Sequence, residues 1–264
     1  MIKLLKGIWR GFLGGVDYKN DATYQFTLDS EMLEVVLPCD YPISFSDRDL
    51  HYPYQSIEWF EDSARVEEQH KFIAIITDGW NFRSFWSLLF YRVYGTLRCS
   101  IRLKKTDCIN VLDKQALSQY VVQAYDDFYN GPEGSNTQLR QLIQEQLPDV
   151  SPEHLEVETM ARIHVWGHPS IPAAMMKSIN NIEWVFYQEI RDTSFERKDF
   201  YCLPLNEDTF LEVRFNYIIQ KRPKKFKRWE KYALELQERI MKSIRLTDIV
   251  AVQASKNTNS QDLK

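Results

Sequence analysis

The sequence contains little glycine, few cysteines and no long apolar run. Only nine of its 264 residues are glycine, and the patterns GxGxxG, GxxxxGK[ST] and GxSxG, which mark nucleotide-binding loops and serine hydrolases, are absent. The four cysteines are far apart with no CxxC spacing, which favours reduced thiols in the cytoplasm over a disulfide framework. No stretch approaches the ~18 apolar residues of a membrane span. We therefore expect no cofactor and find no catalytic motif.

The composition is that of an ordinary globular protein, with 44% hydrophobic and 27% charged residues. The formal net charge of −4 does not favour nucleic acid as a partner. The charges are nevertheless segregated, because residues 17–71 hold thirteen acidic against four basic residues, whereas residues 80–105 hold six basic residues and no acid. Ordinary ion pairs and solvated faces are the favoured interpretation, and a surface for a charged partner is the alternative.

Hydrophobic periodicity and turn residues predict the order of the elements. A hairpin is predicted for residues 23–28 and 32–37, and a strand over 72–76 is followed by a turn at 77–79. Asp113 is predicted to cap a helix that ends near residue 130, and a more polar helix spans about 136–147. Alternating apolar positions predict strands over 93–103 and 155–165, and a short helix is expected at 173–180.

The clearest unit is the last one, residues 182–246. Three strands over 182–190, 199–205 and 209–219 form an antiparallel meander, and a helix of roughly 18 residues follows Pro223. The residues Phe200-Tyr201-Cys202-Leu203-Pro204-Leu205, then Phe210-Leu211-Glu212-Val213, then Trp229 and the segment 240–246 resemble the closing part of PsbP-like α/β/α sandwiches. That superfamily includes photosystem extrinsic subunits, a Ran-binding import factor and bacterial secretion-effector chaperones. The resemblance implies an α+β fold, mainly antiparallel sheet with packed helices, either a PsbP-like sandwich or an elaborated version of it, and a protein that binds partners.

The chain is expected to form one domain over residues 16–251, with an internal boundary near 131–135 as the alternative division. A second alternative is an internal duplication, because Ile57-Glu58-Trp59 is similar to Ile182-Glu183-Trp184. Residues 1–15 form a short basic amphipathic segment, in which Lys3, Lys6 and Arg10 interrupt the apolar core that a signal peptide needs. Packing on the chain itself is favoured for this segment over contact with an anionic membrane surface. Residues 252–264 are polar and are expected to be disordered.

Two basic stretches supply the candidate partner-binding residues. The strand predicted over 93–103 has a polar face with a row of cations, and a second run of positive charges precedes the last helix. Such rows of cations can bind phosphates or an acidic partner. The favoured interpretation is that they pair with acidic side chains of a neighbouring strand or face solvent. The candidates are Arg92, Arg98, Arg102, Lys104, Lys221, Arg222, Lys224, Lys225, Lys227 and Arg228.

The only closely spaced histidines are His164 and His168. On a strand they would share a face, and with Glu156 or Glu158 they could form a metal site. The helical HExxH pattern and paired cysteines are absent, so a structural role is predicted for both histidines and no metal is expected.

These observations favour a non-enzymatic protein–protein interaction module of bacterial type, such as an adaptor, a chaperone or a toxin-neutralising immunity protein. Binding of a polyanion or an anionic membrane surface through residues 92–105 and 221–228 is one alternative. An enzyme with an unrecognised site is the other.

Overall fold

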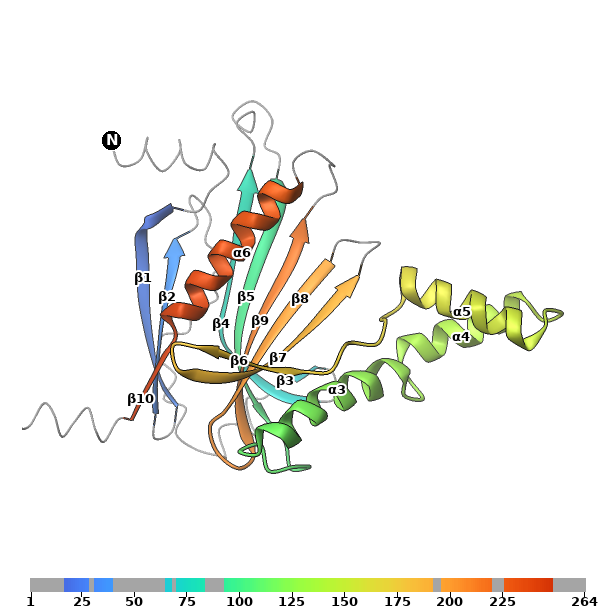
Figure 1. Cartoon of the computed structure of the whole chain (residues 1–264), viewed down its shortest axis with the longest axis horizontal. Helices are drawn as coiled ribbons and strands as arrows, with labels where there is room; N and C mark the ends of the chain where they lie inside the picture. Colours follow the sequence, from blue (N-terminus) through green and yellow to red (C-terminus); the bar gives the residue numbers. More distant parts are fainter. Residues whose placement is uncertain are drawn as a thin grey trace, which may run out of the picture. The chain divides into compact units, whose positions relative to one another are not determined.

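The computed structural model describes residues 17–28, 31–39, 65–67, 70–83, 93–191, 196–219 and 226–248 (Figure 1). The predicted segment 1–15 and the predicted tail 252–264 lie outside these residues. The elements in chain order are β1 (Asp17–Leu28), β2 (Glu31–Cys39), β3 (Arg65–Glu67), β4 (His70–Arg83), β5 (Val93–Lys105), α3 (Lys114–Asn130), α4 (Ser135–Gln146), α5 (Pro152–Trp166), β6 (Met175–Ile179), β7 (Ile182–Arg191), β8 (Glu196–Pro204), β9 (Thr209–Ile219), α6 (Phe226–Ser243) and β10 (Arg245–Asp248). Their backbone contacts divide the chain into two compact units, each described below by itself.

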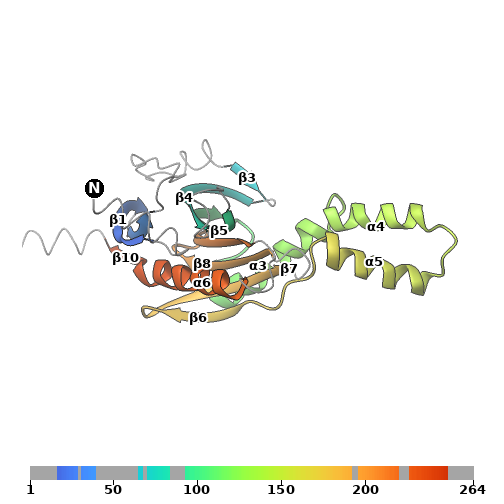
Figure 2. The same ribbon diagram turned by 90° about the horizontal axis from the view of Figure 1, so that it is seen from above.

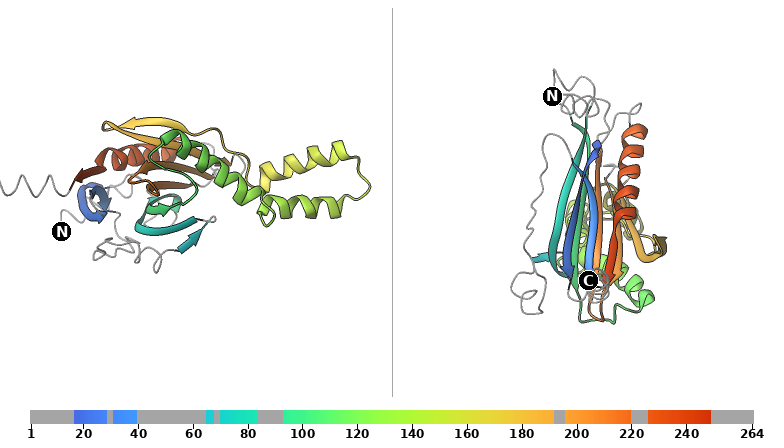
Figure 3. Two further views of the ribbon diagram at one scale, coloured as in Figure 1. Left: turned by 90° about the horizontal axis from the view of Figure 1, so that it is seen from below. Right: turned by 90° about the vertical axis from the view of Figure 1, so that its left-hand side faces the viewer.

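The first unit contains β1, β2, β10 and α6, together with the second part of β4 and the beginning of β5. The sheet order is β1-β2-β10, and both pairings are antiparallel, which confirms the predicted hairpin. Alternate residues of β2 are fully buried because one face of the strand lies in the core. The buried side chains of α6, among them Ala233, Leu236 and Ile240, recur at helical spacing and form one stripe. Figure 3 shows this helix alongside the strands of the sheet. The Ser243 hydroxyl at its end accepts a hydrogen bond from Val36 N at 3.0 Å.

The turn predicted at residues 77–79 is wrong, because β4 continues through it to Arg83. Asp78 is buried, and its carboxylate accepts a hydrogen bond from Gly79 N at 2.8 Å. The buried Trp80 further along the strand donates its indole N–H to Pro38 O at 2.8 Å. Burial of the residues after the Asp-Gly pair therefore outweighs the turn preference of that pair.

The second unit contains most of the second sheet and three helices. The strand order of this sheet is β3-β4-β5-β9-β8-β7-β6. The pairings β7–β8 and β8–β9 are antiparallel, which confirms the predicted meander. Helix α3 packs against β7, and apolar side chains of the two fill the core between them (Figure 2). Together with the first sheet this is the predicted α+β fold, mainly antiparallel with packed helices.

Helix α3 begins where the sequence predicts it. The Asp113 carboxylate accepts hydrogen bonds from Gln115 N at 2.9 Å and Ala116 N at 3.2 Å, and the helix ends at Gly131. Helix α4 occupies almost the predicted range. None of the described helices has both the length and the apolar character needed to cross a bilayer.

Two predictions between α4 and β7 are wrong. The strand predicted over 155–165 is helix α5, which begins with Ser151 as its N-cap and Pro152 in its first turn. Residues 173–180, predicted as a short helix, instead contain the strand β6, which pairs antiparallel with β7. Asn180 and Asn181 join these strands with φ angles of 53° and 62°, the backbone of a tight two-residue hairpin turn that asparagine tolerates.

Candidate functional site

The sequence-predicted site residues fall into three groups. Arg98, Arg102 and Lys104 lie on β5. Lys227 and Arg228 belong to the first turn of α6, although their side chains are not among those the structure describes. Outside the described residues lie Arg92, Lys221, Arg222, Lys224 and Lys225.

On β5 the polar face is not a row of exposed cations. Arg98 is exposed, whereas Arg102 and Lys104 are buried. The Arg102 guanidinium lies over the Phe72 ring at 4.4 Å and donates to Ser100 Oγ at 3.0 Å. Lys104 pairs with Glu212 of the neighbouring strand β9, as the structural interpretation of this row expects. A role in partner binding stays a prediction for Arg98.

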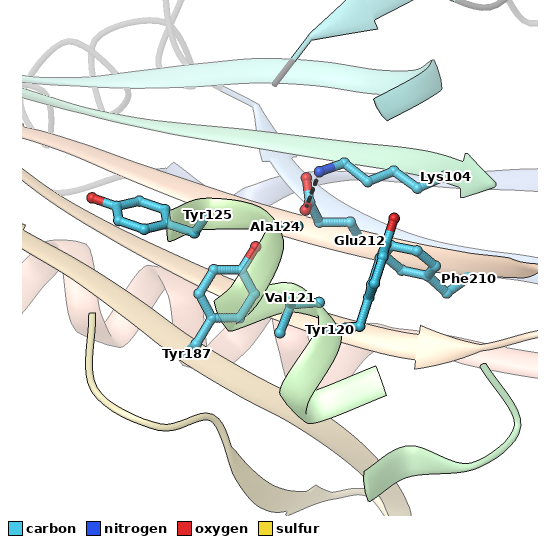
Figure 4. Close-up of a pocket in the computed structure, with 8 residues that line it drawn as sticks. All are labelled: Lys104, Tyr120, Val121, Ala124, Tyr125, Tyr187, Phe210 and Glu212. Carbon is cyan, nitrogen blue, oxygen red and sulfur yellow. Dashed lines mark ion pairs between the residues drawn. The ribbon is translucent and has the colours of Figure 1, made fainter. Parts of the chain in front are cut away.

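The Lys104–Glu212 pair lines a pocket, shown in Figure 4. The Lys104 ammonium is 2.7 Å from Glu212 Oε2, and the two side chains are only 5% and 1% exposed. Burial by itself raises the pKa of Glu212, but the charge of Lys104, aided by Arg102, outweighs it and holds the pKa below its usual value. The carboxylate is therefore ionised at neutral pH.

The remaining walls of the pocket are mainly aromatic, with Tyr120 and Tyr125 from α3, Tyr187 from β7 and Phe210 from β9. Burial raises the pKa of the Tyr120 hydroxyl. The free volume is ≈ 10 Å³, about the room that one water molecule needs. The pocket thus stabilises an ion pair within the fold and has no room for a substrate.

A second polar cluster lies where α4 and α5 join the sheet. The Glu189 side chain on β7 is 2% exposed and accepts hydrogen bonds from His168 Nδ1 at 3.0 Å, Arg191 Nε at 3.1 Å and Lys198 Nζ at 2.7 Å. Burial raises the pKa of Glu189, but the His168 hydrogen bond and the Lys198 charge outweigh it and lower the pKa to about 2. The His168 ring also stacks on Tyr129 at 3.5 Å. This geometry gives His168 the predicted structural role.

Asn136 connects the two helices at the same place. Its side-chain amide donates to His168 O at 2.7 Å and accepts from His168 N at 2.8 Å. A residue in the first turn of α4 thus supplies hydrogen-bond partners for both backbone groups of His168, just after the end of α5. A second donation reaches Asn130 Oδ1 of α3 at 3.1 Å. A side chain at Gly167 would collide with this amide, since a Cβ there would be 2.5 Å from Asn136 Oδ1. Asn136 and the Glu189 cluster therefore fix the base of the α4–α5 hairpin.

The hairpin itself extends away from the sheet of the second unit (Figure 1). On its inner side Ile143 of α4 and Ile163 of α5 are buried, and Arg162 Nη1 donates to Gln146 Oε1 across the helices at 2.8 Å. The opposite side of α5 carries exposed side chains. We call this side the outer face of α5, and its residues are Glu153, Val157, Met160, Ala161, His164 and Val165, all exposed.

The outer face combines apolar side chains with high exposure. Val157 is 67% exposed and Met160 is 60% exposed, although both belong to a regular helix whose other side is packed. Sequence reasoning missed this face because it assigned the segment to a strand, which separates Val157 from Met160. Ser151-Pro152, an N-cap followed by proline in the first turn, was the signal that could have identified the helix.

The pair His164 and His168 is not brought together. His164 is exposed in the last turn of α5, whereas His168 lies beyond the helix against Glu189. Among the described residues no group of three or more His, Cys, Asp or Glu side chains is placed to hold a metal ion. No protein-family model matches this sequence, and no curated protein sequence matches it either. The PsbP-like resemblance therefore stays a prediction.

Proposed function

We infer that this chain is a non-enzymatic protein–protein interaction module of bacterial type, and that the α4–α5 hairpin is its docking element. The single observation that carries this proposal is the outer face of α5, where large apolar side chains stand exposed on a helix that is packed on its other side. Clustered exposed apolar side chains are typical of contact surfaces, whereas scattered ones are ordinary.

The two polar clusters support the same function. The charged groups of the Glu189 cluster hold the base of the hairpin, and the Lys104–Glu212 pair lies inside the second unit. Both clusters thus stabilise the fold. The hairpin is then the remaining candidate for binding, and its base is held by several hydrogen bonds. A rigid base favours binding because less conformational freedom is lost when the partner docks.

The expected gain from docking is moderate. Burying a Val or Met side chain completely contributes about 1.5–3 kcal/mol. Because about two thirds of Val157 and Met160 is exposed, covering both contributes roughly 2–4 kcal/mol. That gain makes these two side chains the centre of the contact.

An adaptor, a chaperone and an immunity protein are the three forms that this function can take. We propose a cytoplasmic location, which the free thiols of Cys99, Cys108 and Cys202 support. Binding of a polyanion or an anionic membrane through the basic stretches remains a prediction that no described contact favours.

The test is capture of the partner from an extract of the native cell by three forms of the purified chain. The unaltered chain is compared with Val157→Glu/Met160→Glu and with a matched control, Gln141→Glu/Gln144→Glu, which adds the same charge to exposed positions of α4. We expect a partner to be enriched by the unaltered chain and by the control, and to be lost with the α5 variant. Equal capture by all three forms, with equal helix content by circular dichroism, contradicts the assignment of α5 as the docking element.

A further inference from the structure

Four residues of the outer face of α5 form a seam along the helix. Glu153, Val157, Met160 and His164 are spaced by 4, 3 and 4 positions, the spacing by which two helices pack side by side. All four are exposed. The seam has two apolar residues at its centre, an acidic residue at one end and a basic residue at the other.

This order is complementary to itself when two helices run antiparallel. If two copies cross midway between Val157 and Met160, Glu153 faces the partner's His164 and Val157 faces the partner's Met160. The two-fold axis repeats both contacts, so the seam gains two apolar contacts between two pairs of opposite charge. A parallel arrangement places Glu153 against the partner's Glu153, which is repulsive.

We propose that the occupant of the outer face of α5 is α5 of a second copy of this chain, packed antiparallel about a two-fold axis. This inference rests on the proposed function, because it names the partner of the same surface. Ala161 lies next to the seam, and its small side chain leaves room for the second helix beside the axis.

The size of the contact sets the strength of the association. A helix of 15 residues is about 22 Å long, and a contact between two single helices buries less than the ~1,200 Å² at which stable interfaces begin. The dimer is therefore weak, with a dissociation constant on the order of 100 µM, and it forms only at high concentration.

The experiment is sedimentation of the full chain from about 10 to 500 µM at about pH 6. We expect a concentration-dependent dimer for the unaltered chain and for the control Gln141→Glu/Gln144→Glu. Val157→Glu/Met160→Glu should remain a monomer throughout the range. A monomeric unaltered chain, or a dimer that survives the change at Val157 and Met160, overturns the inference.

Charge reversal tests the orientation. Glu153→Lys places two cations opposite each other, and His164→Glu places two carboxylates opposite each other, so each variant alone should dimerise about tenfold more weakly. An equimolar mixture of the two variants should recover the association, because the ammonium introduced in one chain then meets the carboxylate introduced in the other. Unchanged dimerisation by either single variant, or no recovery in the mixture, overturns the antiparallel arrangement.

The two proposals fail in different ways. Suppose that the unaltered chain stays monomeric and captures a different protein, and that Val157→Glu/Met160→Glu no longer captures it. This result overturns the self-association alone. A different protein whose capture survives that change overturns the docking role of α5 in the proposed function.

Discussion

Replacing Lys104 by Met removes the cation from a buried pair and leaves the Glu212 carboxylate inside the second unit. Loss of one partner of a buried ion pair typically destabilises by about 3–5 kcal/mol, because the remaining charge has lost both its hydration and its counter-ion. Arg102 and Arg214 still favour the ionised carboxylate, so we expect a value near the lower end, about 3 kcal/mol at pH 7.

The cost should depend on pH with a definite sign. In the unaltered chain the folded pKa of Glu212 lies below its usual value, so its stabilising contribution is present above the unfolded pKa and is lost as pH falls through the folded pKa. Lys104 is the largest influence that lowers this pKa, so its removal should raise the folded pKa of Glu212, and the variant should lose stability relative to the unaltered chain as pH rises. The difference in the free energy of unfolding should therefore be larger at pH 7 than at about pH 4.5, the ordinary range of a glutamate.

Urea denaturation followed by tryptophan fluorescence measures this difference. With an m value of about 2–3 kcal/mol/M, a loss of about 3 kcal/mol lowers the midpoint by roughly 1–1.5 M. The matched control is Lys104→Met/Glu212→Leu, which removes both charges and should recover most of the stability at pH 7. A cost below about 1 kcal/mol at pH 7, or one that is no smaller at about pH 4.5, would refute the view that this pair is held away from water.

Three further predictions concern the hairpin base and the basic run. Asn136→Ala leaves two partly buried backbone groups of His168 without their partner, so we expect a loss of about 2 kcal/mol and faster hydrogen exchange throughout α4 and α5. Unchanged exchange there would contradict the role of Asn136 in fixing the base of the hairpin. Glu189 has a pKa of about 2, so its carboxylate stabilises the chain fully above about pH 4.5. This contribution, about 3 kcal/mol, is lost as pH falls from there through about 2. Glu189→Gln should flatten that part of an acid-unfolding curve, and an unchanged curve would contradict this stabilising role of Glu189. Serine at Lys224, Lys225 and Lys227 should change stability by no more than about 0.5 kcal/mol, and the unaltered chain should show no binding to duplex DNA or anionic vesicles at about 150 mM salt; salt-sensitive binding that the change abolishes would support the polyanion alternative.

Elements with a strong local signal could be predicted from the sequence. The hairpin of β1 and β2, the meander of β7, β8 and β9, and the helices α3, α4 and α6 all appear in the predicted order. In each case the signal lies within a few positions of the element that it predicts. The signal is a repeat of apolar residues, a capping residue or a pair of turn residues. Asp113 is an example, because its carboxylate binds the helix that it begins.

Where two local signals compete, packing chose between them. Residues 155–165 alternate as a strand does, but Ser151-Pro152 precedes them as a helix start and Ile163 is buried on the side of the preceding helix, so the helix forms. The Asp-Gly pair in β4 favours a turn, yet the strand continues because the residues beyond it are buried. Neither outcome follows from a single window of sequence.

The candidate site depended on the tertiary structure most of all. The sequence determined that Arg98, Arg102 and Lys104 share one face of β5, but only the fold decided that Lys104 is buried against Glu212 on another strand. The outer face of α5 became visible only once the helix had replaced the predicted strand. A periodic pattern shows which residues lie on the same face of an element, whereas burial and charge pairing depend on what packs against that face, and residues distant in the sequence supply it.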